Sequence, residues 1–598
     1  MIGKLLESFT QPDLEAVSGL DAAFLYAESP TSHMHIGSVM VIEGGLKFET
    51  FRKRIASRIH LIPKLRKRLV YVPMSIDYPY WADDPNFDLD MHMHHIALPK
   101  PGSWKELRKV TSQIFSEQLD QTRPLWSITF VEGLDNIPQV PKGSVALISC
   151  IHHVVIDGMA GAGILGLLFD FAPEVPEDPK PEPYFPQPLP NELGMVVKST
   201  LSFAENPLKF PKLLTSTLTA SLKAGMVTRV QHADLPTSSF TAPNTSLNGV
   251  RSARRIWNTA ILSLDRIKAI KNIMGTTMND VMLAICAGAL RRYFDEKGKL
   301  PEKPLVAMVP ISVRDGGDDD MSNQISSMLV QLATNVEDPI ERLEVIHENT
   351  VRGKTYQKAM GAKTLAKMAE IVPFGVANQA ARLYTRFRLA ELHDPIANCT
   401  ITNVPGPQFP MYLSGHKLLS IMGLAPIVDG MGLIITIFSY DGLVTITSTS
   451  DAKTMPDIRE FSIFIRESAN ELEELVLKLG KKRKRTVAKK TDTKQTDAYF
   501  TNLKKEWKTN PDRTPAVKGI FNFNIIGDAA AEWKIDTTKK SPVIRRGHAA
   551  KTTAVFTIKD THLHRITAGK LDFATAAVQG RVKTEGDKEK GESFLTEL

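Results

Sequence analysis

The amino-acid sequence predicts an α/β protein built from several domain-sized units. Three observations support this prediction: strand-like and helix-like segments alternate over residues 1–172, eight prolines fall within residues 173–190, and a second alternating block covers residues 251–480. With 598 residues, the chain is too long for a single hydrophobic core and is expected to form about three or four units.

The first block combines two kinds of hydrophobic pattern. Alternating apolar residues predict strands at residues 36–43 and 125–132, and residues 48–62 follow the spacing of an amphipathic helix. The apolar run at residues 145–151 predicts a buried strand, and the small residues at 159–168 predict a helix after it. Together these elements form the first expected α/β domain.

A proline-rich linker separates the two blocks. Proline lacks an amide donor and disfavours helix, so residues 173–190 are expected to be extended, within a linker of residues 173–250 that includes a helical stretch at 208–230. The second α/β domain is expected over residues 251–480. Its expected elements are helices at residues 279–293, 354–392 (broken at Pro373) and 455–478, and strands at residues 305–311, 398–404 and 433–440.

The tail has a different composition from the two blocks. The run from Lys481 to Arg485 opens a basic segment, residues 481–515, whose apolar content is too low to fold alone, so a flexible tether is expected. A nuclear-localisation or nucleic-acid-binding tail is the alternative, although no interleaved aromatic residues or binding motif support it. Residues 516–590 alternate in polarity and predict a small α+β module. Its expected elements are strands near residues 521–525, 533–535, 554–558 and 580–585, and a helix at residues 570–578.

Charge and cysteine content narrow the classes of partner and compartment. A net charge of +8 and a pI near 9.0 favour phosphates, anionic lipid surfaces or nucleic acid as partners. Cys150, Cys286 and Cys399 are widely spaced in apolar settings, which indicates neither a disulfide framework nor a zinc ribbon and fits a reducing cytosol. The N-terminus contains Glu7 and Asp13 and lacks a sustained apolar region, which argues against a signal peptide. No stretch offers about twenty uninterrupted apolar residues, so any membrane contact is expected to be peripheral.

Two adjacent histidines follow the buried strand predicted at residues 145–151. His152, His153, Asp157 and Gly158 form the pattern HHxxxDG. A histidine that only hydrogen-bonds inside a core is one explanation. A metal site is disfavoured because adjacent strand residues face opposite sides, and no HExxH helix or cysteine pair completes a ligand set. No GxSxG elbow supplies a nucleophilic serine, so the pattern indicates a histidine base that acts on a substrate directly.

Five further motifs accompany HHxxxDG. They are Ser18-Gly19-Leu20-Asp21, Pro124-Leu125-Trp126, Asn279-Asp280, Val309-Pro310-Ile311-Ser312-Val313-Arg314 and Thr402-Asn403-Val404-Pro405-Gly406-Pro407. With these motifs in this order, roughly residues 15–478 resemble the bacterial wax ester synthase/acyl-CoA:diacylglycerol acyltransferase family. HHxxxDG alone is shared with a wider superfamily of acyltransferases and peptide-condensation enzymes, so the other motifs distinguish the family. Thr402 stands where the family usually has serine, a change that keeps the hydroxyl.

The resemblance implies a fold and an activity. The fold is α/β, with two chloramphenicol acetyltransferase-like subdomains joined by the linker. The activity is transfer of a fatty acyl group from acyl-CoA to a long-chain alcohol or a diacylglycerol, with no cofactor and no metal. His153 is then expected to be the general base, and no covalent acyl-enzyme is needed because CoA thiolate leaves readily. We expect a cytoplasmic protein, peripherally associated with the anionic inner membrane or lipid inclusions, and no nucleic-acid partner.

The resemblance also assigns roles around the histidines. His152 is expected to orient the turn, because adjacent strand residues face opposite sides and one histidine alone can face the substrates. Asp157 is expected to pair with Arg314, as the matching residues of the superfamily do, and to hold the loop that carries His153. Gly158 would permit the tight backbone entry into the following helix.

Two asparagines are further candidates for substrate binding. Asn279 lies in an apolar segment, where a buried amide either anchors a domain interface or donates to the reacting carbonyl. Asn403 opens the segment Asn403 to Pro407, which resembles the family's crossover segment. Packing between the two halves is the other explanation for that segment.

The tail, about residues 519–587, resembles a sterol carrier protein type 2 domain. Its motifs are Trp533-Lys534-Ile535-Asp536, Gly569-Lys570-Leu571 and Gly580-Arg581-Val582-Lys583-Thr584-Glu585-Gly586-Asp587. Such a domain holds lipids in an apolar cavity; a module that merely solubilises the enzyme is the alternative. Two other functions for the whole chain remain: a condensation-type acyltransferase that uses a carrier-protein thioester, and a non-catalytic lipid-binding or droplet-coating protein. Intact His153, Asp157 and Gly158 argue against the non-catalytic reading, and no carrier domain adjoins.

Overall fold

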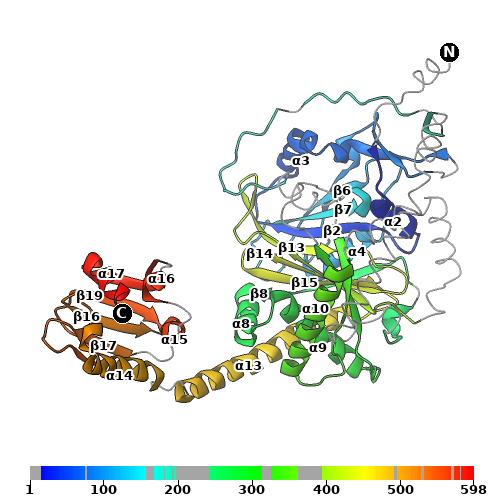
Figure 1. Ribbon diagram of the computed structural model, residues 1–598. Coiled ribbons are helices and arrows are strands. Elements are labelled where there is room, and N and C mark those ends of the chain that lie inside the picture. Colours follow the sequence, from blue (N-terminus) through cyan, green and yellow to red (C-terminus); the bar gives the residue numbers. More distant parts are fainter. Residues whose placement is uncertain are drawn as a thin grey trace, which may run out of the picture. The chain divides into compact units, whose positions relative to one another are not determined.

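The computed structural model of the chain forms two compact units, Met1–Val476 and Leu477–Leu598 (Figure 1). Each unit has its own hydrophobic core, and the boundary between them falls within one long helix. The residues that the structure describes are 15–73, 77–155, 168–180, 182–190, 194–196, 242–249, 251–312, 325–360, 394–490, 494–526, 531–567, 572–578 and 581–598.

One six-stranded sheet of the first unit carries four strands from the N-terminal half of the chain. They are, across the sheet, β2 (His35–Ile42), β7 (Val145–His152), β6 (Trp126–Glu132) and β5 (Met93–Ala97). The strands expected at residues 36–43, 125–132 and 145–151 are therefore confirmed. Every residue of β7 is buried, as a central strand of a covered sheet requires.

Helices cover both faces of this first sheet. α3 (Phe48–Arg58) packs apolar side chains on one face, and it confirms most of the helix expected at residues 48–62. α4 (Trp104–Phe115), which the sequence pattern did not reveal, covers the other face. It begins at a capping box in which Ser103 and Glu106 satisfy each other's backbone amides.

The second six-stranded sheet of this unit is built from the C-terminal half. In order its strands are β10 (Ile325–Gln331), β9 (Val306–Ser312), β11 (Cys399–Pro405), β14 (Leu433–Tyr440), β15 (Leu443–Asp451) and β8 (Arg255–Ser263). The three strands expected at residues 305–311, 398–404 and 433–440 are confirmed as β9, β11 and β14. β8 and β15 were missed, although they form the longest antiparallel pairing of this sheet.

Helices α8 (Leu264–Met274), α9 (Met278–Asp295), α10 (Pro339–Met360) and α13 (Ile458–Lys490) accompany the second sheet. α9 confirms the helix expected at residues 279–293. α10 begins earlier than the expected helix at 354–392, whose later part lies outside the described residues, as does the helix expected at 208–230. Among the described helices, none alone is long and apolar enough to span a membrane; α8 and α9, bent by 104°, meet that test jointly by length and composition only.

The two halves of the chain share a sheet. β13 (His416–Leu424), from the second block, pairs antiparallel with β2 in the first sheet. The chain reaches this position through Gly406, whose amide donates to the carbonyl of Ser439 at 2.9 Å. A Cβ at Gly406 would lie 2.5 Å from that oxygen, so glycine alone fits there. The domains expected over residues 1–172 and 251–480 are thus not separate in the fold, because a strand from the second completes the sheet of the first.

The start of the proline-rich segment is held to helix α3 by ion pairs. Residues 175–180 and 182–190 form neither helix nor strand, in line with the proline content. Asp170 and Asp178 both pair with the arginines of α3: Arg54 contacts both carboxylates, and Arg58 contacts Asp178 at 2.9 Å and Asp170 at 3.3 Å. The Arg54 side chain is fully buried, and its two carboxylate partners offset the cost of burying that charge.

The second unit is a five-stranded sheet with helices. Its strands, in the order of the sheet, are β18 (Val543–Arg546), β17 (Ala531–Asp536), β16 (Ile520–Ile526), β19 (Ala554–Lys559) and β20 (Val582–Gly586). Its helices are α14 (Lys494–Thr509), α15 (Asp560–Thr567), α16 (Phe573–Val578) and α17 (Lys588–Thr596). The expected α+β class is confirmed.

The expected flexible tether over residues 481–515 is wrong in most of its length. α13 continues to Lys490, and α14 occupies Lys494–Thr509. α14 places Phe500, Leu503 and Trp507 in the core of the second unit, which explains the helix, because the spacing i, i+3, i+7 puts the three side chains on one face. Because basic residues surround these three positions, the sequence analysis did not recognise the apolar face of this helix.

Candidate active site

The two histidines of HHxxxDG lie where the buried strand β7 leaves the first sheet. His152 is its last residue, and its amide donates to the carbonyl of Leu125 at 2.9 Å. His153 begins a short 3-10 helix, and its amide donates to the carbonyl of Met34 at 2.8 Å. The expectation that the histidines end a buried strand is confirmed. Residues 156–167, and with them Asp157 and Gly158, lie outside the described residues.

His152 is a buried, neutral side chain that braces the turn. Its Nδ1 accepts a hydrogen bond from the amide of Val154 at 3.1 Å, so the proton of the ring must be on Nε2. Nε2 lies 3.5 Å from Oε2 of Glu28, close enough for electrostatic attraction. Nδ1 is therefore taken by the backbone, whereas Nε2 faces the Glu28 carboxylate without a hydrogen-bond partner among the described residues.

His153 points to a different neighbour. Its ring stacks on Phe24, with centroids 3.7 Å apart and planes 10° apart. Burial lowers the pKa of His153 to about 4; its own backbone carbonyl opposes this shift, and a positive charge on His152 would add to it. The imidazole is accordingly neutral at pH 7, the form that can accept a proton.

Helix α2 (Gly19–Ala27) supplies the partners of both histidines, and sequence reasoning missed them. The motif at residues 18–21 starts this helix: Ser18 is the N-cap and accepts from the amide of Asp21 at 3.1 Å. Phe24 lies within the helix, and Glu28 is its C-cap residue, four positions further along the chain. That spacing downstream of an N-cap is the sequence signal that could have identified them.

Glu28 is held as a carboxylate. Burial raises its pKa, but interactions with His152, Gln118 and Gln121 outweigh burial and bring the pKa below its usual value. The Gln121 amide donates to Oε2 at 2.5 Å. A negative charge therefore stands beside the Nε2 proton of His152, which fixes that tautomer.

The Pro124-Leu125-Trp126 motif forms the strand edge next to the histidines. Trp126 pairs with Ile151 in the ladder between β6 and β7. Its Nε1 donates to the carbonyl of Leu65 at 2.8 Å, and its own carbonyl accepts from Nδ1 of His92 at 2.8 Å. The motif is thus a scaffold for the end of β7.

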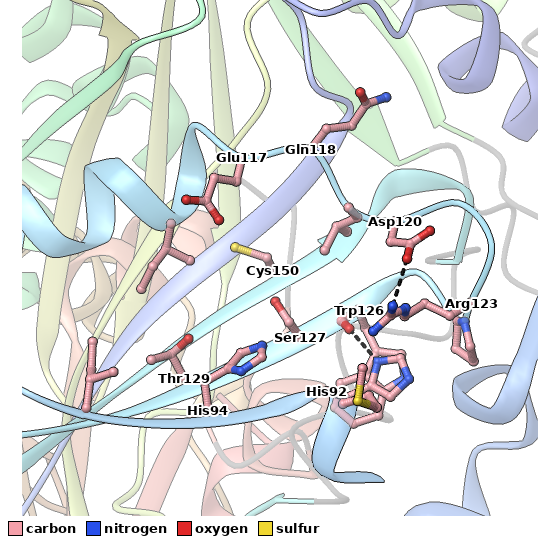
Figure 2. Close-up of a pocket in the computed structure, with 15 residues that line it drawn as sticks. His92, His94, Glu117, Gln118, Asp120, Arg123, Trp126, Ser127, Thr129 and Cys150 are labelled. Carbon is pink, nitrogen blue, oxygen red and sulfur yellow. Dashed lines mark hydrogen bonds and ion pairs between the residues drawn. The ribbon is translucent and has the colours of Figure 1, made fainter. Parts of the chain in front are cut away.

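A pocket of about 460 Å³ opens on the sheet face that carries Cys150, two residues before His152 (Figure 2). Figure 2 shows the Arg123–Asp120 ion pair at one end and the side chains of Glu117 and Gln118 above Cys150. The lining mixes polar and apolar side chains in nearly equal number, so its composition favours neither a polar group nor a saturated acyl chain. Its lining consists of Met91, His92, His94, Ile96, Ile114, Glu117, Gln118, Leu119, Asp120, Arg123, Pro124, Trp126, Ser127, Thr129 and Cys150.

The cysteines show no sign of nucleophilic chemistry. All three are free and buried. Burial, with the charge of Glu117, raises the pKa of Cys150 to about 12, and burial raises the pKa of Cys399 to about 12. Among the described residues, no group of three or more His, Cys, Asp and Glu side chains is placed to hold a metal ion.

In the Asn279-Asp280 motif, the aspartate rather than the asparagine is the buried residue. Asp280 accepts from the amide of Thr277 at 2.9 Å, from Oγ1 of Thr350 at 2.7 Å and from Nδ1 of His347 at 2.7 Å. It caps α9 and ties that helix to α10. Asn279 is half-buried at the start of α9, so its amide is less enclosed than that of a core residue.

The remaining candidates lie on the second sheet or outside the described residues. Asn403 is half-buried on β11, opposite Ile437 of β14. Arg314, the expected partner of Asp157, is outside the described residues. The structure therefore brings together His152, His153 and the two motifs on α2 and β6, whereas Asn279 and Asn403 belong to elements of the other sheet.

Replacing Glu28 tests this arrangement. We expect Glu28→Ala to lower the free energy of unfolding by about 1–3 kcal/mol, because the Gln121 amide loses its acceptor and the buried Nε2 proton of His152 loses the charge beside it. Glu28→Gln, which keeps an oxygen acceptor, should cost less. Urea unfolding followed by tryptophan fluorescence measures both, with exposed Glu43→Ala as the control. Equal stability of Glu28→Ala and Glu43→Ala would contradict the proposed contact.

Comparison with known proteins identifies the family. The wax ester synthase/diacylglycerol acyltransferase catalytic domain matches residues 17–282, the C-terminal domain of the same family matches 321–473, and the SCP-2 sterol transfer family matches 500–596. The last match starts inside α14, in agreement with the early start of the second unit's core.

Similar proteins lead to the same family. Two putative diacylglycerol O-acyltransferases of Mycobacterium tuberculosis are each 31% identical to this chain: one over 452 residues (74% of this chain and 87% of the relative), the other over 477 residues (77% and 100%). The solved wax ester synthase/diacylglycerol acyltransferase from Marinobacter aquaeolei VT8 shares the fold, with a TM-score of 0.56, 24% identity, and coverage of 77% of this chain and 99% of that one. The chain therefore belongs to the wax ester synthase/diacylglycerol acyltransferase family and is an acyltransferase with a C-terminal SCP-2 domain.

Proposed function

We propose that the enzyme transfers a fatty acyl group from acyl-CoA to the hydroxyl of a diacylglycerol or a long-chain alcohol, with His153 as general base. The observation that carries this proposal is the neutral His153 ring, fixed by Phe24 at the end of a rigid strand. A neutral, oriented imidazole can take the hydroxyl proton as the alcohol oxygen attacks the thioester carbon. The carbon–sulfur bond then breaks, and the proton passes to the departing CoA thiolate.

No covalent acyl-enzyme is required by this scheme. The thiol is a good leaving group and the alcohol is itself the nucleophile, so acyl-CoA and acceptor react in a ternary complex. The high pKa of Cys150, raised by burial, agrees with a route that does not use a cysteine. Acyl-CoA enters as a substrate in this scheme.

The other site residues take supporting roles. His152 orients the turn through its bond to Val154. Asp157 pairs with Arg314 to hold the loop after the histidines, and Gly158 permits the tight backbone there, as the family resemblance implies. Asn279 and Asn403 are candidates for binding substrate or donating to the oxyanion.

The acceptor is tested directly with two substrates. The names of the similar proteins favour a diacylglycerol, and the family model includes wax ester synthases, so both acceptors belong in the assay. Purified protein is incubated with palmitoyl-CoA and either dioleoylglycerol or hexadecanol, and free thiol release is measured. If no free thiol is released with either acceptor, the result would favour a condensation-type enzyme that uses a carrier-protein thioester, or a non-catalytic lipid-binding protein.

We also propose that the enzyme works at an anionic membrane or lipid-inclusion surface on the cytoplasmic side. The SCP-2 domain supports lipid handling, and the run from Lys481 to Arg485 supports attraction to anionic lipid. A lipid-binding domain on the same chain raises the local concentration of a poorly soluble acceptor near the enzyme.

His153→Ala is expected to lower kcat by roughly 100-fold to 10,000-fold, because general-base catalysis contributes that much. Thiol release from palmitoyl-CoA measures the loss. His95→Gln, at a half-exposed histidine on edge strand β5, is the control and should keep wild-type turnover. Near-normal ester synthesis by a folded His153→Ala variant would overturn the assignment.

The pH dependence follows from the lowered pKa of His153. Because the neutral ring is the active form, kcat/KM should stay level as pH falls past 6.5 and decline with an inflection near the pKa of about 4. The same shift lowers the free energy of unfolding as the pH falls below about 6.5. His153 has a pKa near 6.5 in the unfolded chain and about 4 in the folded protein, so between these values the unfolded chain binds the proton more readily. An inflection near 6.5 in kcat/KM, with the protein still folded by circular dichroism, would contradict the buried base.

Truncation after Gly480 separates catalysis from lipid access. Turnover on a short, soluble alcohol should be nearly unchanged, whereas activity on vesicle-presented dioleoylglycerol and binding to anionic vesicles should fall, the latter in a salt-dependent manner. Equal loss on both acceptors would mean instead that the tail stabilises the first unit. Assays at matched enzyme concentration, with melting temperatures of both proteins, distinguish the two outcomes.

A further inference from the structure

The positive charge of this protein is concentrated in its second unit. Residues 477–598 contain 27 Lys and Arg against 14 Asp and Glu, a net charge of +13, whereas residues 1–476 carry −5. Eight of these 27 basic residues lie between Lys478 and Lys490. These eight residues contribute +8 of the excess, because no Asp or Glu lies among them, and residues 491–598, which include the folded SCP-2 domain, contribute the remaining +5.

The sheet of the second unit has one face packed on helices. The aromatic side chains of its strands contact rings of α14, α16 and α17, as in the pairs Phe500–Trp533, Phe523–Phe573 and Phe521–Phe594. Side chains alternate along a strand, so the residues between these aromatic positions point to the opposite face. We call this opposite face of the second unit's sheet the outer face.

Two unpaired cations stand directly opposite each other on the outer face. Lys534 of β17 and Arg545 of β18 are register partners, next to the inward pair of Trp533 and Arg546. Like charges directly opposite each other on neighbouring strands destabilise a sheet. Among the described residues, no ion pair relieves either cation, whereas Arg546 is bound by both carboxylate oxygens of Asp497 at 2.7 Å. Lys534 is attracted to Asp536 on its own strand, but the register partner of Arg545 is a cation, so an external anion can relieve the repulsion within the pair.

The surroundings of this pair are also basic. Residues 537–559 contain no Asp or Glu, and their loop is held in place by reciprocal bonds between Asn522 and the backbone of Ala549, both at 3.1 Å. Two carboxylates face the same side of β17: Glu532, which is exposed, and Asp536, which accepts from the amide and hydroxyl of Thr538. The exposed lysines of the stretch 537–559 are Lys539, Lys540, Lys551 and Lys559.

Apolar residues share this face, and aromatic residues do not. Ile526 is 41% exposed and is the register partner of Lys559, and Val543 and Val555 are half-buried. Single-stranded nucleic acid is typically held by stacking on aromatic side chains, and here the aromatic residues of the strands point inward. Cations mixed with aliphatic side chains fit the interface of a lipid bilayer.

We propose that the outer face of the SCP-2 domain docks on an anionic phospholipid surface, through Lys534, Arg545 and the basic loops beside them. This inference rests on the membrane association proposed above and names the surface that makes it. The docking would place the lipid-handling domain against the phase from which a water-insoluble acceptor must come.

The test compares two single charge reversals in the full-length protein, Lys534→Glu on the outer face and Lys504→Glu on the exposed side of α14, which packs on the opposite face. Each basic residue near an anionic surface contributes about fivefold to affinity, so a reversal at the docking face should weaken binding by about 25-fold. Binding is measured by co-sedimentation with phosphatidylcholine vesicles that contain phosphatidylglycerol. We expect Lys504→Glu to weaken binding by less than about fivefold, through the long-range field alone.

Stability supplies a second readout. Lys534→Glu puts a carboxylate opposite Arg545 but also beside Glu532 and Asp536, so the two effects oppose each other and the melting temperature should change little while vesicle binding falls. Equal loss by Lys504→Glu and Lys534→Glu, or unchanged binding by Lys534→Glu, would overturn the proposal. Tighter binding of the wild type to single-stranded DNA than to the vesicles at the same salt concentration would overturn it as well.

The experiments distinguish failure of the docking proposal from failure of the proposed function. Turnover of Lys534→Glu on a soluble alcohol should equal that of the wild type, because the residue is remote in sequence and unit from the histidines. Loss of vesicle binding only when Lys481 to Arg485 are changed to glutamine would leave membrane association standing and reject the outer face. Activity retained by His153→Ala would reject the general base and leave the docking result intact.

Discussion

The candidate active site depends on the burial of β7. This strand is hydrogen-bonded on one side to β2 and on the other to β6, and helices cover both faces of its sheet. A strand held in this way has one register and one end point, so the turn at His152 and His153 cannot drift. Reaction rates fall steeply when a catalytic group is misplaced by an ångström, and a rigid support prevents this. The motifs of α2 and β6 matter because they brace that end point.

Burial also sets the chemistry of the base. A His153 ring with a pKa of about 4 is a weaker base than an exposed imidazole, yet it is in its neutral form at every physiological pH. The reaction can tolerate the weaker base because the thioester is activated and the thiolate leaves easily. The neighbouring His152 cannot replace it, because its Nδ1 is bound to the backbone and its Nε2 proton faces Glu28.

The two units of the chain carry net charges of opposite sign. The acyltransferase unit carries both sheets, joined by β13, and a net charge of −5; the SCP-2 unit carries its own aromatic core and a net charge of +13. Opposite charges on the two units give an anionic lipid surface a preference for the SCP-2 unit. The position of Lys534 opposite Arg545 is consistent with docking on an anionic lipid surface, because a bound anion would relieve the repulsion between the two cations.

The sequence by itself determined the α/β class, the histidine pair at the end of a buried strand and the SCP-2 tail, because apolar periodicity and short motifs are local properties. It did not reveal α14, whose three apolar positions are surrounded by lysines, or β8 and β15, whose partners lie far away in the chain. Phe24 and Glu28 became visible as partners of the histidines only in the folded chain, since α2 and β7 are more than a hundred residues apart. The exchange of β13 into the first sheet was likewise decided by tertiary structure, because strand pairing depends on which edges meet after folding.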